Sequence, residues 1–188
     1  MLPLGTPAPD FALQSADGRA VKRDDFKDAK ALVVMFVCNH CPFVVHVKDE
    51  LRKLYEDYKD RGVAFVAINA NDTNEYPEDS PENMRDRADE WGWKFPYLYD
   101  ETQEVAKAYH AACTPDIFVF DADRKLAYRG QLDSSRPNNG QPVTGADLRR
   151  ALEAVLEGEM PNEEQIPSIG CNIKWKPDNA PQYALGGY

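Results

Sequence analysis

Two cysteines three positions apart, Cys38 and Cys41, are the strongest chemical signal in the sequence. They lie in the segment Cys38-Asn39-His40-Cys41-Pro42. The apolar run 31–37 directly before them has the length and β-branching of a strand buried on both faces. A second thiol at this spacing can attack a mixed disulfide formed by the first and release the product. The spacing therefore predicts thiol–disulfide exchange at the end of a buried strand.

The order of attack follows from the helix expected after the strand, which we predict to begin at Cys38 or Asn39. Unpaired N–H groups and the positive end of the helix dipole lower a thiol pKa from about 8.5 towards about 3.5–7.5. We expect Cys38 to attack and Cys41 to resolve, because the more N-terminal sulfur should lie nearer to solvent and to those N–H groups. Asn39, His40 and Pro42 are expected to shape the site, His40 as a cationic donor when protonated.

A metal site is an alternative for the same segment. Cys38, His40, Cys41 and His46 are soft and borderline ligands that suit copper or zinc, as in a metal carrier. Adjacent ligands at 40 and 41 and the absence of a second remote pair argue against a structural zinc site, and His46 fits a surface or half-buried helix position. We predict no resident metal and no cofactor. A redox-dead adaptor protein with inert thiols is a further alternative.

A second cysteine segment, Cys113-Thr114-Pro115, directly precedes the apolar run 117–120. A Thr-Pro bond at a strand entry is a candidate for a cis peptide. Cys113 and Cys171 have two interpretations, as small buried hydrophobic side chains or as an auxiliary redox pair. A bridge between them would need Cα atoms within about 7 Å.

The elements around these segments predict an α/β fold. The runs 31–37 and 63–68, with a helix between them ending at Gly62, predict a right-handed parallel β-α-β unit. After these strands we expect a polar loop, 69–81, and a helix to Trp91 with Ser80 or Asp79 as its N-cap and Pro81 at its first helical position. A short apolar segment, 95–99, a helix, 101–111, and an antiparallel strand pair, 117–120 and 126–130, follow. The last predicted helix opens with a capping-box-like start at 144–147 and ends at Gly158. Together they predict a central mixed sheet flanked by helices on both faces.

Composition limits the class of protein. The chain has 188 residues, 43% of them hydrophobic and 29% charged, and a net charge of −10. These values fit one globular domain and exclude disorder, a membrane-spanning protein and a nucleic-acid-binding face. We expect the domain to span residues 1–160 and a Pro/Gly-rich tail, 161–188, to pack on it. With no secretion signal at the start, we expect a cytoplasmic protein whose cysteines are kept reduced.

The chain resembles the thioredoxin-like superfamily and, within it, the redoxin group that includes peroxiredoxin-like and membrane-anchored reductase-like proteins. The resemblance spans about residues 5–158. It is carried by the opening Gly5-Thr-Pro-Ala-Pro-Asp-Phe-Ala-Leu13, the strand-CxxC-helix, Thr114-Pro115 before a strand, and the closing β-β-α. It implies a thioredoxin-like fold with a redoxin-type insertion between 63 and 95. It also implies a cis Pro115 beside the CxxC and a Thr114 backbone available to pair with a bound peptide.

The resemblance leaves the reaction partner open. Its implied partners are a protein or small-molecule disulfide and a thiol electron donor. The tail segment 168–176 is similar to that of a peroxiredoxin-like subgroup with the same Cys-Asn-His-Cys-Pro site. A peroxiredoxin site resembles Pro-x-x-x-Thr-x-x-Cys, but counting back from Cys38 gives Met35 and Ala31. A thiol peroxidase or antioxidant protein, with Cys38 oxidised by peroxide and resolved by Cys41, is therefore kept as an alternative.

Overall fold

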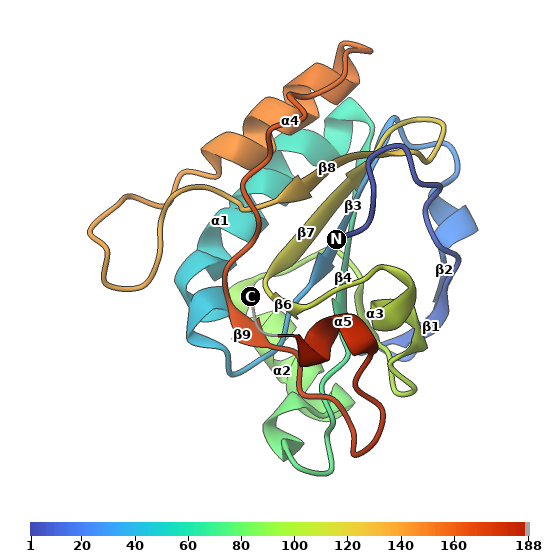
Figure 1. Cartoon of the computed structure of the whole chain (residues 1–188), viewed down its shortest axis with the longest axis vertical. Coiled ribbons are helices and arrows are strands. Elements are labelled where there is room, and N and C mark those ends of the chain that lie inside the picture. The colour runs from blue at the N-terminus through green and yellow to red at the C-terminus, as the bar shows by residue number, and fades with distance from the viewer. Residues whose placement is uncertain (187–188) are drawn as a thin grey trace.

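A seven-stranded mixed sheet forms the centre of the computed structural model, which describes residues 1–186 (Figure 1). Its strand order is β2-β1-β5-β4-β3-β7-β8. The strands are β1 (Ala12–Ser15), β2 (Ala20–Lys22), β3 (Ala31–Phe36), β4 (Val63–Asn69), β5 (Tyr97–Tyr99), β7 (Asp116–Phe120) and β8 (Leu126–Gly130). A separate two-stranded sheet joins β6 (Cys113–Thr114) to β9 (Cys171–Asn172).

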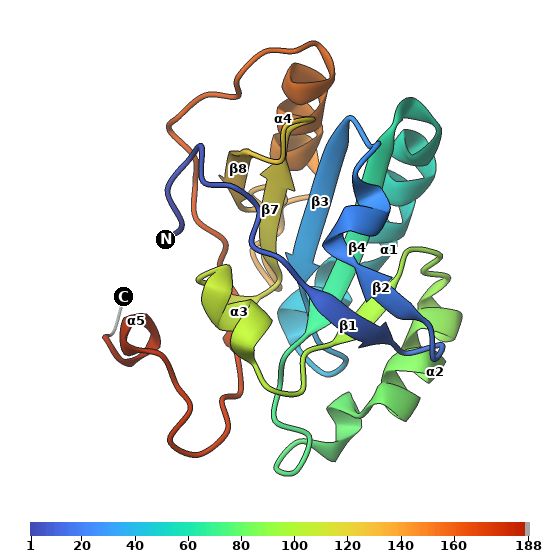
Figure 2. The same cartoon turned by 90° about the vertical axis from the view of Figure 1, so that its right-hand side faces the viewer.

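Helices cover both faces of the sheet, as the sequence predicts (Figure 2). The first face carries α1 (Pro42–Tyr58), α2 (Pro81–Trp91) and α4 (Ala146–Leu156), and the second carries α3 (Glu104–Ala108) with the N-terminal segment and part of the tail. The remaining helices are the 3₁₀ turns η1 (Arg23–Phe26), η2 (Lys59–Arg61) and η3 (Pro77–Asp79), and α5 (Gln182–Leu185) in the tail. The predicted α/β class with a central mixed sheet is confirmed.

Strand β3 lies in the middle of the sheet because all six of its side chains are buried and apolar. It pairs in parallel with β4, from Ala31 opposite Val63 to Phe36 opposite Ile68, and antiparallel with β7. Alternate side chains enter the two cores, with Met35 facing α1 and Phe36 facing Tyr109. The predicted β-α-β unit is therefore correct, and the carboxyl end of β3 delivers the chain to Cys38.

Two helix predictions need correction. The third helix is shorter than 101–111, because Gln103 takes a left-handed conformation (φ 66°) and the Asp100 carboxylate accepts the N–H of Ala106. The last helix has no capping box at its start, where Gly145 (φ 67°) is the N-cap. Asp133, twelve residues earlier, accepts the N–H groups of Thr144 and Gly145 instead. Both ends depend on contacts that no local pattern shows.

The tail crosses the molecule from α4 to β9 and then reaches α5 (Figure 1). Ile173 is buried and Trp175 packs against the core on the second face. A Cβ atom at Gly130 would lie 2.5 Å from the Ile166 carbonyl oxygen, and one at Gly170 would lie 1.9 Å from the Thr114 carbonyl oxygen. The tail therefore approaches the domain too closely for any side chain at these two positions. None of the helices in residues 1–186 is long and apolar enough to cross a membrane.

Candidate active site

The helix that follows the CxxC segment begins at Pro42, and Cys41 is its N-cap. This corrects the expected start at Cys38 or Asn39. The proline ring disfavours helical geometry in the residue before it, so Cys41 is extended (φ −68°, ψ 123°), while Pro42 fits the first helical position. The positive end of the helix dipole therefore acts on Cys41 more strongly than on Cys38.

Both thiols are buried against the Thr114–Pro115 segment. Cys38 is 1% exposed and Cys41 is 0% exposed, and neither is in a disulfide. The Cys38 sulfur lies 3.6 Å from the Thr114 hydroxyl, and the Cys41 sulfur lies 3.3 Å from the Thr114 carbonyl oxygen. The Thr114–Pro115 bond is cis, as expected. The chain thus brings the two predicted segments together, although 73 residues separate Cys41 from Thr114.

The environments of the two sulfurs move their pKa values in opposite directions. Hydrogen bonding from the Cys38 thiol lowers the pKa of Cys41 to about 4, aided by donors on Cys171 and Thr114 and opposed by burial. The same hydrogen bond raises the pKa of Cys38, and burial and the nearby Asp79 carboxylate raise it further. These interactions favour ionisation of Cys41 over Cys38. When Cys41 is protonated, its thiol donates to the Thr114 carbonyl oxygen.

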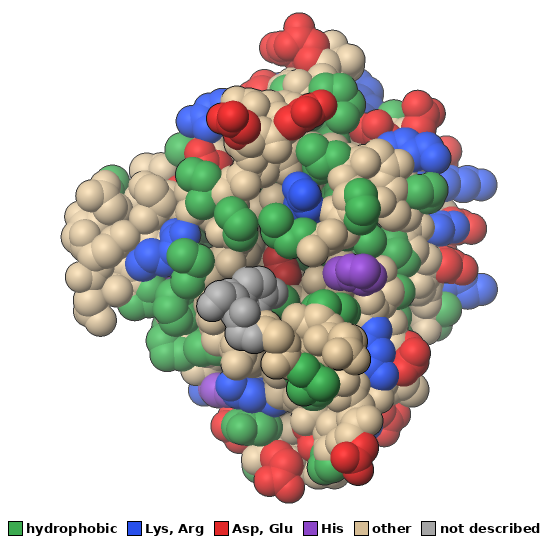
Figure 3. Space-filling model, in the orientation of Figure 1, with side chains coloured by type: hydrophobic (Ala, Val, Ile, Leu, Met, Phe, Trp, Pro, Cys, Tyr) green, Lys and Arg blue, Asp and Glu red, His purple; other side chains and the backbone are tan. Residues whose placement is uncertain are grey.

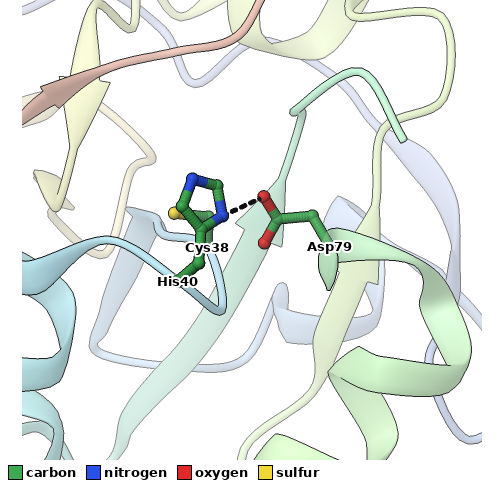
Figure 4. A group of neighbouring side chains, drawn as sticks. All are labelled: Cys38, His40 and Asp79. Carbon is green, nitrogen blue, oxygen red and sulfur yellow. Dashed lines mark ion pairs between the residues drawn. The ribbon is translucent and has the colours of Figure 1, made fainter. Parts of the chain in front are cut away.

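Asp79 is a site residue that the sequence did not reveal. It is fully buried in η3, the turn before α2, and its carboxylate accepts the backbone N–H of Asn39 at 2.7 Å and the side-chain amide of Asn71 at 2.9 Å. The oxygen that accepts from Asn71 also lies at ion-pair distance, 2.7 Å, from His40 Nδ1 (Figure 4). The sequence does contain a signal for this proximity. Because β3 and β4 are parallel, the loop 69–81 after β4 and Cys38 after β3 begin at the same edge of the sheet.

His40 connects this acid to the first thiol. Its ring lies between Cys38 and Asp79 in Figure 4 and stacks on Tyr76 with a centroid separation of 5.7 Å. The contact with Asp79 is close but not aligned as a hydrogen bond. With 29% of its side chain exposed, His40 is the part of the CxxC segment that reaches solvent most clearly.

Asn39 fixes the loop between the cysteines. Its side-chain amide donates to the Glu78 carbonyl oxygen at 2.9 Å, and its side-chain oxygen accepts the Tyr97 hydroxyl at 2.8 Å. Asn39 itself is only 3% exposed, so these bonds form away from solvent. Asn39 thus holds the loop between the cysteines to η3 and β5.

The tail strand β9 changes the expectation for Thr114. The Thr114 backbone is not available to a bound peptide, because Thr114 pairs with Cys171 in the β6–β9 ladder. Cys113 pairs with Asn172, so Cys113 and Cys171 project to opposite faces of this small sheet. This arrangement argues against the alternative in which Cys113 and Cys171 form a redox pair. Cys171 interacts instead with Cys41, whose pKa it lowers by hydrogen bonding.

Cys113 faces a separate cavity of about 470 Å³ between β7 and the tail. Its sulfur contacts the carbonyl oxygens of Pro115 and Ser168. Asp116 also lines this cavity, and burial raises its carboxyl pKa to about 6. Hydrophobic side chains gather around a hollow on this face of the molecule (Figure 3).

The metal-ligand alternative takes a different form from the one expected. Within residues 1–186, the side chains close enough to share an ion are Cys38, His40 and Asp79, with ligand atoms within 4.8 Å of one another. Cys41 and His46, which the sequence suggested, are outside this group. His46 lines a separate small cavity together with Phe43 and Pro115.

Comparison with known proteins gives a relative with a redox name and a more similar structure of an uncharacterized protein. Over 154 residues, the chain is 26% identical to the thiol-disulfide oxidoreductase ResA of Bacillus thuringiensis subsp. konkukian, covering 82% of this chain and 77% of that protein. The crystal structure of an uncharacterized conserved protein from Geobacillus kaustophilus is 63% identical, with a TM-score of 0.93 and coverage of 95% of both chains.

A more distant structure supports the thioredoxin-like fold. The thioredoxin domain of a thiol-disulfide oxidoreductase from Bacteroides vulgatus is 21% identical, with a TM-score of 0.59, and covers 69% of this chain and 89% of that domain. The family model named Redoxin matches residues 3–148, which include the whole central sheet, the CxxC segment and the cis-proline. The chain belongs to the Redoxin family.

Proposed function

We propose that this chain catalyses dithiol–disulfide exchange through Cys38 and Cys41. The predicted enzyme class, thiol-disulfide oxidoreductase, is confirmed by the Redoxin match and the relatives of that name. The assignment to these two residues rests on one observation, that both reduced thiols contact Thr114 beside the cis Thr114–Pro115 bond.

The exchange proceeds in two steps that balance. Cys38 gives its proton to the Cys41 sulfur and attacks a substrate disulfide, so that a mixed disulfide forms and one substrate sulfur leaves as a thiolate. Cys41 then attacks the Cys38 sulfur and gives its proton to the departing substrate. A Cys38–Cys41 disulfide remains, and the substrate has gained the two electrons that the dithiol lost.

Cys38 keeps its predicted role as the attacking thiol and Cys41 as the resolving thiol, but for a different reason from the one the sequence suggested. Cys41 is enclosed by Cys38, Thr114 and Cys171, whereas Cys38 lies beside the partly exposed His40. Cys41 serves first as the proton acceptor for Cys38 and then as the resolving thiol. Because the pKa of Cys38 is raised and that of Cys41 is lowered, this proton transfer is unfavourable and contributes to the barrier of the first attack.

Serine variants test the assignment with an aromatic disulfide as the reporter substrate. We expect Cys38→Ser and Cys41→Ser to lose multiple turnover, and Cys41→Ser to accumulate a mixed disulfide at Cys38 that mass spectrometry can locate. Cys113→Ser is the matched control, because its sulfur faces the other side of β6, and it should retain activity. Accumulation at Cys41 in the Cys38→Ser variant, with none at Cys38, would reverse the roles.

The substrate class is a disulfide, and the electron donor is a thiol. We place the reaction in the cytoplasm, where thiols are kept reduced and the pair returns to its dithiol form. Cell fractionation with an antibody against the chain tests this location, and recovery outside the cytoplasmic fraction would contradict it.

A peroxidase reaction is a second candidate, favoured by the Thr114 hydroxyl 3.6 Å from the Cys38 sulfur. Attack of the Cys38 thiolate on peroxide would give a sulfenic acid, and Cys41 would resolve it with loss of water. Peroxide-dependent loss of one thiol in Cys41→Ser, trapped by a sulfenic-acid reagent, supports this reaction. A thiol count that peroxide leaves unchanged excludes it.

The carrier alternative would use Cys38, His40 and Asp79, which present sulfur, nitrogen and oxygen within 4.8 Å. Soft and borderline ligands of this kind suit copper or zinc. Elemental analysis of the purified reduced protein tests it directly. About one metal ion per chain, lost in Asp79→Asn, supports a carrier, and metal far below one per chain excludes it.

A further inference from the structure

Cys171 lies on the tail strand β9, opposite the residue that contacts both CxxC sulfurs. In the β6–β9 ladder Cys171 is opposite Thr114, and directly opposed residues project to the same face of a sheet. The Thr114 hydroxyl on that face lies 3.6 Å from the Cys38 sulfur, and the Thr114 carbonyl oxygen lies 3.3 Å from the Cys41 sulfur. Hydrogen bonding with the Cys171 side chain and backbone lowers the pKa of Cys41. Cys41 therefore interacts with both of the other thiols, Cys38 and Cys171.

The tail is held in this position by several contacts. Gly170 lies so close to the Thr114 carbonyl that a Cβ atom would be 1.9 Å from its oxygen. The N–H of Ile173 donates to Ala112, and the N–H of Lys174 donates to the Asn71 side chain at 2.9 Å. Ile173 is also buried in the second core. The position of Cys171 is thus fixed on both sides along the chain.

We propose that Cys171 is a third redox cysteine, which takes over the disulfide of the Cys38–Cys41 pair. The inference rests on the proposed exchange at that pair. The Cys171 thiolate attacks the Cys41 sulfur, a Cys41–Cys171 bond forms and the Cys38–Cys41 bond breaks. Cys38 leaves as a thiolate and takes up the proton that Cys171 released. The step is an exchange with no net oxidation, so no additional oxidant is needed.

This transfer of the disulfide from Cys38–Cys41 to Cys41–Cys171, here called the relay, moves the disulfide to a more accessible sulfur. Cys38 and Cys41 are buried, whereas Cys171 is half-buried. A dithiol reductant attacks Cys171, and Cys41 leaves as a thiolate, a departure favoured by its many hydrogen-bond donors. The second thiol of the reductant then attacks the mixed disulfide and releases Cys171. The reductant ends as a disulfide, and all three cysteines are reduced.

Disulfide mapping of the Cys38→Ser variant tests the relay. The variant is equilibrated in a thiol–disulfide buffer that oxidises the wild-type pair, quenched with acid, alkylated, digested and analysed by mass spectrometry. We expect a Cys41–Cys171 peptide in this variant and none in Cys38→Ser/Cys171→Ser. Cys38→Ser/Cys113→Ser is the matched control and should keep the bridge. Free thiols at both Cys41 and Cys171 in folded Cys38→Ser would overturn the proposal.

The wild-type chain provides a readout that does not depend on a variant. Its fully oxidised form should contain both Cys38–Cys41 and Cys41–Cys171 peptides, with the first appearing earlier in a quenched time course. Mapping Cys171→Ser separates the two proposals. If Cys171→Ser forms the Cys38–Cys41 disulfide but neither the wild-type chain nor Cys38→Ser forms a Cys41–Cys171 bridge, only the relay is contradicted. Absence of the Cys38–Cys41 bridge in Cys171→Ser contradicts the proposed function itself.

Discussion

The backbone N–H of Asn39 donates to the buried carboxylate of Asp79 at 2.7 Å, although the two residues are 40 positions apart. This bond ties the loop between the cysteines to the turn before α2. The same carboxylate also lies 2.7 Å from His40 and raises the pKa of Cys38. One acid therefore positions the CxxC loop and opposes ionisation of its first thiol.

Asp79→Asn should make Cys38 easier to ionise. The amide keeps an oxygen for the Asn39 N–H but removes the charge that disfavours the Cys38 thiolate. In a Cys41→Ser background, we expect alkylation of Cys38 near neutral pH to be faster by a factor on the order of 3–10. Rates measured against pH by mass spectrometry check this, with Glu78→Gln as the control on the exposed acid beside His40. Unchanged or slower alkylation in Asp79→Asn would show that the charge does not control this thiol.

Cys171→Ala should raise the pKa of Cys41. The substitution removes the thiol that donates to the Cys41 sulfur but keeps the backbone N–H. The ultraviolet absorbance of the thiolate, followed as pH rises from about 3 to 8, reports this ionisation. Wild-type protein should gain absorbance well below the range of ordinary thiols, and the variant should gain it at higher pH. Coincident curves would mean that Cys171 does not stabilise the Cys41 thiolate.

Gly170→Ala should separate the tail from the cis-proline segment. The added methyl group would meet the Thr114 carbonyl, and relief of such overpacking costs about 1–3 kcal/mol of stability. In the Cys38→Ser background, we expect the yield of the Cys41–Cys171 disulfide to fall by about tenfold. Gly186→Ala is the matched control, because a Cβ atom there meets no described atom within 4 Å. Equal bridge yields in the two variants would contradict the close packing of the tail.

Asp116 should make the fold less stable as pH rises. Burial raises the pKa of its carboxyl from 3.8 to about 6. A folded-state pKa above the unfolded value contributes stability that is complete below about pH 4 and is lost as pH rises through about 6. The shift corresponds to on the order of 3 kcal/mol. Denaturant unfolding between about pH 4 and 7 should show this loss in wild type and a flatter profile in Asp116→Asn. Parallel profiles would contradict the assignment.

Much of the fold could be predicted because local signals agreed with tertiary packing. The apolar run 31–37 gave the central strand, Gly62 ends the first helical segment in a left-handed conformation, and Ser80 caps α2 with its side chain. The hairpin of β1 and β2 was missed, since its strands have only four and three residues and are largely exposed. Short exposed strands leave little periodicity to detect.

The site was predictable in its cysteines and cis-proline but not in what surrounds them. The predicted start of the helix at Cys38 or Asn39 is wrong because Pro42 holds Cys41 in an extended conformation. The sequence pattern marks Asp79 only as a candidate helix cap, because its contacts with Asn39 and His40 depend on how the loop 69–81 folds back over the sheet edge. The approach of Cys171 to Cys41 depends on the register of β9, which a two-residue strand does not reveal in sequence.

Redox titration with disulfide mapping tests the central claim most directly. The chain is equilibrated against defined thiol–disulfide buffers, quenched, and its bridged cysteines are identified at each potential. We expect a reversible Cys38–Cys41 disulfide with a midpoint between about −180 and −300 mV. If Cys38 and Cys41 remain free thiols at every potential while the protein stays folded, dithiol exchange at this pair is wrong.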